Sequence, residues 1–293
     1  MAGDLSVGQQ TDGFVWHAGK LTNLGLLPGG ANTEVSGINQ CGDVVGEAQA
    51  GDGTLHAFVW RDGRLTDLGT PGSNSGATAI NDSGQIIGTS DATGGRTLAT
   101  VWHNGKATTL PGLGGYSAPL AQDDAGLVVG YSENTSGVAH AAIWSNGKLT
   151  DLGPGQAVDV DSSGQVLVCG AGAGRPESAF LWQNGKKTAL PTGLWSVTGL
   201  NDKGQVIGTY GTEGVNGFVW HDGTMTSLGN VQPLAINDLG QIITFGGTVL
   251  HNGTTTALSP TDNRPNAISD TGLVVGLSGA PVGATIWQAP AAS

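Results

Sequence analysis

The nine-residue stretch INQCGDVVG, residues 38–46, decides the fold, because close copies of it return along the whole chain. The copies read INDSGQIIG, QDDAGLVVG, VDSSGQVLV, LNDKGQVIG, INDLGQIIT and ISDTGLVVG. Self-similarity at a spacing of 32 to 42 residues indicates a repeat architecture. The glycine that the copies share stands at Gly42, Gly84, Gly126, Gly164, Gly204, Gly240 and Gly272.

Two further elements belong to the same repeat. An apolar triplet that ends on Trp occurs as GFVW, AFVW, ATVW, AAIW, AFLW, GFVW and ATIW, with a degenerate copy, GTVL, that ends at Leu250. Short turns such as RDG, HNG and SNG follow the Trp, and then a segment such as RLTDLG or KLTDLG. The triplet occurs first at Trp16 and last at Trp287, so it is present once more often than the other elements.

Each element has the character of a β-strand, because it is short, rich in β-branched and aromatic residues and bounded by Gly, Asn and Asp. The glycines of the two turns stand where a positive φ is needed. Four antiparallel strands in about forty residues, repeated, are typical of β-propeller blades. We therefore predict an all-β fold, a seven-bladed β-propeller that forms a single domain over residues 1–293 and is closed by N- and C-terminal strands. Eight blades, two of them incomplete, are the alternative, and a solenoid would need polar caps at both ends.

The pattern INDxGQxxG…HAFVW..G..TDLG resembles the bacterial HAF repeat, whose name-giving triplet is His56-Ala57-Phe58 here and weakens to His140-Ala141-Ala142. The resemblance covers nearly the whole chain. It implies a β-propeller and, for many such proteins, secretion. It implies no activity that transfers to particular residues.

Composition excludes several classes of partner. The net charge is −12, and the 11 basic residues form no run, so nucleic acid and anionic membranes are not expected as partners. Cys41 and Cys169 lie in unrelated repeats and show neither a disulfide framework nor metal-ligand spacing. We expect a monomer without metal or cofactor. The start of the chain has no signal peptide, so we expect a cytoplasmic protein, or an extracellular one if a leader has been removed.

Residues that recur in every copy are expected to have a structural role in the blade. The residues that depart from the repeat are therefore the candidates for a functional role. Seven Trp and four Phe belong to the third strand and are expected to be core. The remaining five aromatic residues all lie in the longer connections, which we place together on one rim, over the third, fifth and sixth blades. These five residues are Tyr116, Tyr131, Trp195, Tyr210 and Phe245.

Two polar residues break the pattern of the first strand. Gln122 stands where the other copies carry Ile, Leu or Val, and Asp159 stands where they carry Gly or Ala. The first strand is innermost in kelch-like blades, so both side chains are expected to approach the central channel. Charged or polar loop residues that could add contacts there are Glu133, Arg175, Glu177 and Glu213.

Aromatic faces around a few polar groups are typical of a small-molecule site. We therefore expect a small organic molecule or glycan to bind at the mouth of the channel, on blades three to six. The alternatives are an enzyme of natural-product metabolism, cyclase or lyase-type, with Asp159, Tyr131 and Glu133 as candidate catalytic residues, and a protein-interaction platform. No Ser–His–Asp arrangement is predicted, since four of the six histidines follow the third strand and the other two, His56 and His140, belong to the repeat.

Overall fold

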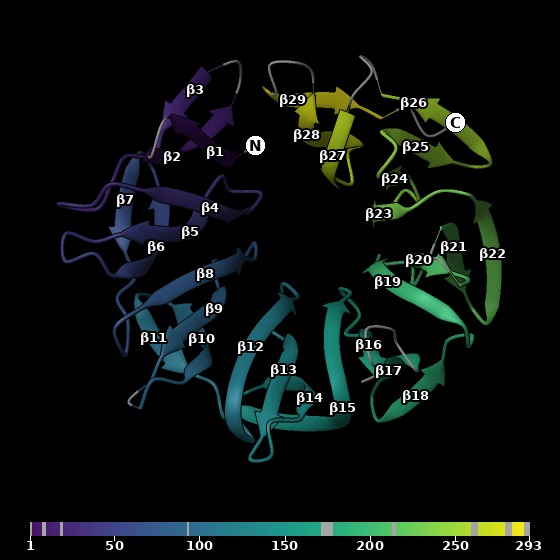
Figure 1. Cartoon of the computed structure of the whole chain (residues 1–293), viewed down its shortest axis with the longest axis horizontal. Coiled ribbons are helices and arrows are strands. Elements are labelled where there is room, and N and C mark those ends of the chain that lie inside the picture. The colour runs from purple at the N-terminus through teal and green to yellow at the C-terminus, as the bar shows by residue number, and fades with distance from the viewer. Residues whose placement is uncertain are drawn as a thin grey trace. The chain divides into compact units, whose positions relative to one another are not determined.

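In the computed structural model the described residues are 2–7, 10–17, 20–92, 94–170, 178–212, 215–258, 263–278 and 283–289. Every regular element in these ranges is a β-strand, and neighbouring strands whose register is known pair antiparallel. The chain forms two compact units, Met1–Val160 and Asp161–Ser293. The all-β prediction is confirmed, and Figure 1 labels the strands.

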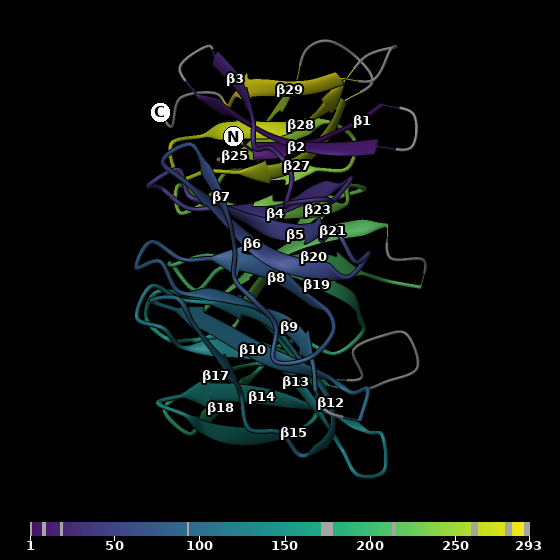
Figure 2. The same ribbon diagram turned by 90° about the vertical axis from the view of Figure 1, so that its left-hand side faces the viewer.

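The first unit contains β1 to β15. Its sheets have the strand orders β1-β2-β3, β4-β5-β6-β7, β8-β9-β10-β11 and β12-β13-β14-β15, and they follow one another in chain order in Figures 1 and 2. The strands are β1 (Ala2–Val7), β2 (Gln10–His17), β3 (Lys20–Asn23), β4 (Thr33–Ile38), β5 (Val44–Gln49), β6 (Leu55–Arg61), β7 (Arg64–Asp67), β8 (Ser75–Ile80), β9 (Ile86–Asp91), β10 (Thr97–His103), β11 (Lys106–Thr109), β12 (Gly114–Gln122), β13 (Val128–Asn134), β14 (Ala139–Ser145) and β15 (Lys148–Val160).

The second unit contains β16 to β29, in the strand orders β16-β17-β18, β19-β20-β21-β22, β23-β24-β25-β26 and β27-β28-β29. The strands are β16 (Val166–Gly170), β17 (Ala179–Gln183), β18 (Lys186–Ala189), β19 (Leu194–Leu200), β20 (Val206–Tyr210), β21 (Asn216–His221), β22 (Thr224–Gly229), β23 (Pro233–Ile236), β24 (Ile242–Thr244), β25 (Thr248–His251), β26 (Thr254–Ala257), β27 (Asn263–Ile268), β28 (Leu273–Ser278) and β29 (Gly283–Gln288).

The terminal sheets differ from the four-stranded ones. Both β1–β3 and β27–β29 have three strands, and each contains its own copy of the strand that ends on Trp. The described residues therefore contain four-stranded sheets, such as β4–β7 and β19–β22, and a three-stranded sheet at each end of the sequence.

The predicted turns are confirmed by their backbone angles. The glycine between first and second strands has a positive φ in all seven copies, for example 85° at Gly42 and 77° at Gly272. In the turns between third and fourth strands both central residues have a positive φ, as with Asp62 (52°) and Gly63 (80°). This is the geometry of two-residue hairpins whose twist matches the flanking strands. We call the end of each sheet that carries these two turns the turn end, and the opposite end the loop end.

The core lies between successive sheets. The two adjacent valines of β5 point to opposite faces: Val44 packs in one cluster with Phe58 and Leu24, while Val45 packs in the next cluster with Trp102. Trp102 and Trp144 are only 1% and 2% exposed. A strand that is buried on both faces is continuously apolar, and this explains the runs VVG, IIG and VLV that follow each turn.

The repeated Asn of the turn joins one sheet to the next. The side-chain amide of Asn39 donates to the carbonyl oxygen of Asn81 at 3.1 Å, and that of Asn81 donates to the carbonyl oxygen of Asp123 at 2.9 Å. In the second unit Asn201 donates in the same way to Asn237 at 2.9 Å, and Asn237 to Ser269 at 2.9 Å. The side-chain oxygen of the same Asn also accepts a backbone N–H within its own turn, such as that of Gln241 at 2.8 Å. One amide thus serves two sheets.

The repeated Asp beside it forms a second series. The N–H of Gln40 donates to the carboxylate of Asp82 at 2.8 Å, and the N–H of Asp82 donates to Asp124 at 2.9 Å. In the second unit the N–H of Asp202 donates to Asp238 at 2.8 Å, and that of Asp238 to Asp270 at 2.8 Å. The sequence motif INDxG is therefore an inter-sheet hydrogen-bonding device as well as a turn.

Candidate functional site

In the first unit, two of the predicted aromatic residues lie near the loop end of β12 and β13. Tyr116 is 48% exposed, and Tyr131 is half-buried and paired with Ala118 of β12. Glu133, two residues further along β13, is also half-buried. The structure therefore brings these three side chains to neighbouring strands of one sheet. The predicted loop residues Arg175, Glu177 and Glu213 lie outside the described residues.

A cavity of about 490 Å³ opens at the turn ends of β4, β8 and β12, and Gln122 lies in its lining. The amide group of Gln122 is held by the neighbouring sheet: its oxygen accepts from Gln85 Nε2 at 3.0 Å, and its Nε2 donates to the Gln85 carbonyl at 3.0 Å. The apolar side chains in the wall include Ile38 and Leu120, which are 38% and 37% exposed. This cavity combines exposed apolar surface with fixed polar groups, as small-molecule sites do.

Gln122 and Tyr116 lie at opposite ends of the same strand. They are six residues apart, which corresponds to about 20 Å along a β-strand. A compact ligand cannot contact both side chains. Only an extended molecule lying along β12 would reach from one to the other.

Asp159 lies near the turn end, in the last part of β15. Its side chain is half-buried, and its Oδ1 accepts the backbone N–H of Val160 at 2.9 Å. Like Gln122, it is engaged with the protein's own polar groups.

The remaining predicted aromatic residues belong to the second unit. Phe245, 65% exposed, directly follows β24, and Tyr210, half-buried, ends β20. The hydroxyl of Tyr210 donates to Ser227 Oγ at 3.0 Å. Trp195 lies near the start of β19, on the strand next to β20, and is half-buried. All three lie near loop ends, but the prediction that they lie in the connections is wrong for Trp195 and Tyr210, which belong to β19 and β20 because the strand pairing extends past the repeated motif.

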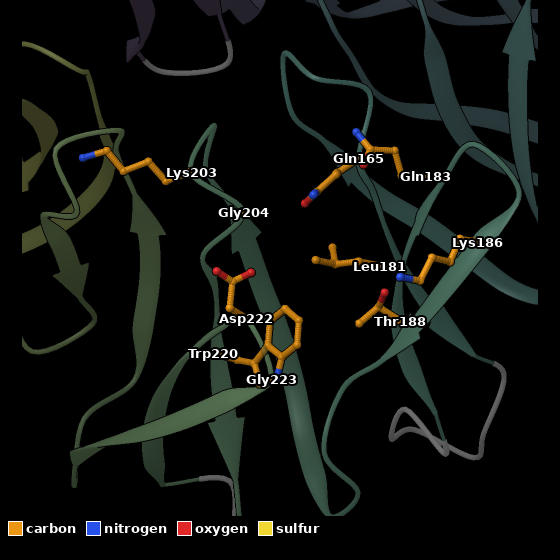
Figure 3. Close-up of a pocket in the computed structure, with 10 residues that line it drawn as sticks. All are labelled: Gln165, Leu181, Gln183, Lys186, Thr188, Lys203, Gly204, Trp220, Asp222 and Gly223. Atoms are coloured by element: carbon orange, nitrogen blue, oxygen red, sulfur yellow. The ribbon is translucent and has the colours of Figure 1, made fainter.

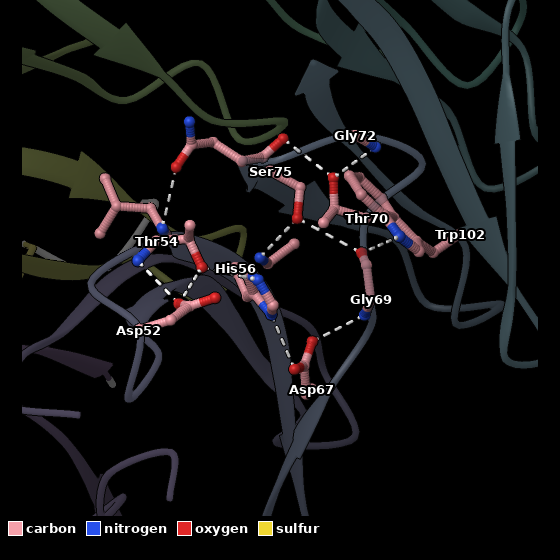
Figure 4. Close-up of polar contacts among 12 residues, drawn as sticks. Asp52, Thr54, His56, Asp67, Gly69, Thr70, Gly72, Ser75 and Trp102 are labelled. Carbon is pink, nitrogen blue, oxygen red and sulfur yellow. Dashed lines mark hydrogen bonds and ion pairs between the residues drawn. The ribbon is translucent and has the colours of Figure 1, made fainter. Parts of the chain in front are cut away.

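A hydrogen-bonded Thr–His–Asp arrangement, which the sequence did not reveal, lies at the loop end of β6 (Figure 4). Thr54 Oγ1 lies 3.0 Å from His56 Nε2, and His56 Nδ1 lies 2.8 Å from Asp67 Oδ2. Thr54 also donates to Asp52 at 2.5 Å, and this bond lowers the pKa of Asp52. In a nucleophilic triad the hydroxyl donates to the histidine. Here the Thr54 hydroxyl donates its one proton to the carboxylate of Asp52 and not to His56. The arrangement therefore has the geometry of a structural hydrogen-bond network.

The other repeats support the structural interpretation. His140 and Asp151 form the same cross-strand pair at 2.9 Å in the sheet of β12–β15. Asp12 and Asn23 occupy the same two positions in the first sheet and bond at 3.2 Å. The signal that could have revealed these pairs is the constant separation of eleven residues between the two partners.

Other reactive groups in the described residues give no further centre. Burial raises the pKa of the Cys169 thiol to about 11, so it is protonated at neutral pH and a poor nucleophile. Among the described residues, no group of three or more His, Cys, Asp and Glu side chains is placed to hold a metal ion. No helix in this part of the chain is long and apolar enough to cross a membrane.

Comparison with known proteins bears on the fold. No family model matches the chain, and no curated protein matches its sequence. Among solved structures, the β-propeller domain of the Trilobed protease from Pyrococcus furiosus is 10% identical with a TM-score of 0.56, and the match covers 86% of this chain and 93% of that one.

Two whole peptidases are also similar. An acylaminoacyl peptidase from Pyrococcus horikoshii is 11% identical with a TM-score of 0.54, over 87% of this chain and 50% of that one. A puromycin-hydrolyzing peptidase from Mycobacterium tuberculosis is 12% identical with a TM-score of 0.53, over 92% of this chain and 54% of that one. The chain spans about half the length of these two peptidases. At such identities the likeness shows the fold alone, which is that of the β-propellers.

Proposed function

We propose that the chain is a β-propeller of four-stranded blades, built from HAF-type repeats, that binds a small organic molecule or a glycan at the mouth of its central channel. The prediction of seven blades, with eight as the alternative, belongs to this proposal. Each three-stranded terminal sheet has its own Trp strand, and this observation favours eight. End-on views of the purified protein by electron microscopy would count the blades directly.

One observation carries the binding proposal: the cavity of about 490 Å³ at the turn ends of β4, β8 and β12 has Gln122, a residue that departs from the repeat, in its wall. The exposed aromatic side chains at the loop ends supply a second kind of contact, because Tyr and Phe rings stack on sugars and other flat apolar faces. The length of β12 between Gln122 and Tyr116 favours an extended ligand such as an oligosaccharide. Residues proposed to bind are Tyr116, Gln122, Tyr131, Asp159, Trp195, Tyr210 and Phe245.

The test is a screen of the purified chain on an array of neutral and acidic oligosaccharides, followed by titration of each hit. Gln122→Ile places at this position the residue that the neighbouring copy carries at Ile80, and Tyr116→Ala removes an exposed ring. We expect each variant to weaken binding about tenfold, as loss of one good contact does. Leu21→Ala is the control, because Leu21 is 59% exposed on β3 and lies outside the proposed site. Absence of any hit, or hits that bind both variants as tightly as the parent, contradicts the proposal.

A further inference from the structure

A second cavity lies wholly within the second unit, at the turn ends of the sheets β16–β18 and β19–β22 (Figure 3). Its volume is about 510 Å³. Leu181 and Trp220, which are 6% and 3% exposed, form its apolar wall. Its polar lining includes Gln165, Gln183, Lys186 and Thr188.

Gln165 has an unsatisfied acceptor. In the described part of the chain, its Oε1 is the buried side-chain oxygen that has no hydrogen-bond partner. The equivalent oxygens of Gln205 and Gln241 each accept from the Asn four residues earlier, at 2.8 Å. A buried acceptor without a donor costs about 1–3 kcal/mol, so this position calls for an explanation.

The cause is one residue. The place of the turn Asn is taken by Asp161, whose side chain lacks the N–H donor of an amide. Its Oδ1 accepts instead from the N–H groups of Ser163 and Gln165 and from the Ser163 hydroxyl. Gln165 Oε1 therefore lacks a donor within the protein, and since this oxygen is buried, the Gln165 side chain must turn toward the cavity to accept from a molecule there.

The surrounding groups define what that molecule must carry. In Figure 3 the side chains of Gln165 and Lys186 point toward the middle of the labelled residues, whereas Lys203 points away from them. The Nε2 of Gln183 is held by the Ser163 carbonyl at 3.0 Å, so this side chain is fixed in place. Asp222 is the carboxylate of this lining, but its side chain is 90% exposed and lies 3.7 Å from His221 Nε2. The ligand therefore needs a hydroxyl or N–H donor for Gln165, an apolar face for Leu181 and Trp220, and a negative charge on the side of Lys186.

We propose that this cavity binds an acidic sugar, a pyranose that carries a carboxylate. Its ring hydroxyl donates to Gln165 Oε1, its C–H face lies on the apolar wall, and its carboxylate pairs with Lys186. The site does not depend on the proposed channel site, because it shares no residue with it.

The experiment follows the indole N–H of Trp220 by NMR while D-glucuronate, D-galacturonate or D-glucose is added to the full chain. Lys186→Gln removes the cation, and Asp161→Asn gives Gln165 the internal donor that its counterparts have. We expect each variant to weaken uronate binding about tenfold. Lys187→Gln is the matched control, because the ammonium of Lys187 lies over the Phe180 ring at 4.4 Å, and it should bind like the parent.

The proposal is overturned if neither uronate perturbs Trp220, or if both bind Lys186→Gln and Asp161→Asn as they bind the parent. Equal affinity for glucose and the uronates overturns the assignment of an acidic ligand. A folding defect is kept apart from a binding defect by the amide spectrum of each variant. Asp161→Asn introduces the residue that four other copies carry at this position, namely Asn39, Asn81, Asn201 and Asn237, and is expected to fold.

Discussion

The two ends of the sheets contrast with each other. At the turn ends the same hydrogen bonds recur, as between Asn81 and Asp123 in the first unit and between Asn237 and Ser269 in the second. At the loop ends the connections differ from sheet to sheet, and exposed rings such as Tyr116 and Phe245 stand there without a repeated partner. The hydrogen bonds that join neighbouring sheets thus recur at the turn ends, whereas the connections at the loop ends vary in sequence from sheet to sheet.

The contrast has exceptions that are instructive. Gln122 and Asp161 stand at turn ends and break the repeat there. Gln122 compensates by bonding to Gln85 of the neighbouring sheet. Asp161 leaves Gln165 Oε1 without a donor. A departure from the repeat at a turn end can therefore add a bond between sheets, as at Gln122, or leave a neighbouring acceptor without an internal donor, as at Asp161.

The largest effect is expected from Asn237→Ala. Asn237 is 2% exposed and bonds to Gln241 Oε1, the Gln241 N–H and the Ser269 carbonyl. Its loss removes three hydrogen bonds, two of them to Gln241, which is only 1% exposed, while the Ser269 carbonyl keeps the N–H of Gly272 at 2.9 Å. The free energy of unfolding should therefore fall by about 3 kcal/mol in urea denaturation. A loss below about 0.5 kcal/mol would show that the inter-sheet series is not stabilising.

A smaller effect is expected at the loop end from the pair His56 and Asp67. His56→Leu and Asp67→Thr introduce the residues that the next sheet carries at these places, Leu98 and Thr109. Because the Asp67 side chain is 41% exposed, a double-mutant cycle should give a coupling of only about 0.5–1 kcal/mol. A coupling energy as large as the loss expected for Asn237→Ala would contradict the conclusion that the stabilising contacts between sheets lie at the turn ends.

The smallest effect concerns Glu47 of β5. Burial, and to a lesser degree the charge of Glu34, raises the pKa of Glu47 above its ordinary value. A carboxyl whose pKa is raised on folding destabilises the folded state once it ionises. Glu47→Gln should therefore raise the free energy of unfolding at pH 7 by less than about 1 kcal/mol. The gain should vanish below the ordinary pKa of Glu. A gain that persists unchanged at pH 3 would assign the effect to packing instead of charge.

The sequence predicts much of the fold because the same pattern of strands and turns recurs in every repeat. The positive φ of the turn glycines and the burial of Trp102 and Trp144 follow from residue type and position alone. The partners of side chains do not follow in this way. Nothing local shows that Asn39 bonds across a sheet boundary, or that Gln122, predicted to approach a channel, bonds to Gln85.

The candidate site was predictable only in part. The sequence places the five aromatic residues in the longer connections, whereas in the structure only Phe245 follows a strand and the other four lie within strands, near the loop ends. The distance between Tyr116 and Gln122 depends on both lying on one strand, β12, which the sequence treated as a loop followed by a strand. The cavity beside Gln165 depends on a missing donor, which becomes visible only when the bonds of equivalent glutamines are compared.

A reciprocal exchange tests most directly the claim that the turn Asn carries the scaffold. Asp161→Asn supplies a donor for Gln165 Oε1, and Asn237→Asp removes the donor for Gln241 Oε1. We predict opposite shifts in the free energy of unfolding, a gain of about 1 kcal/mol for the first variant and a loss of about 2 kcal/mol for the second. Shifts of the same sign, or no shift in either variant, would contradict the account.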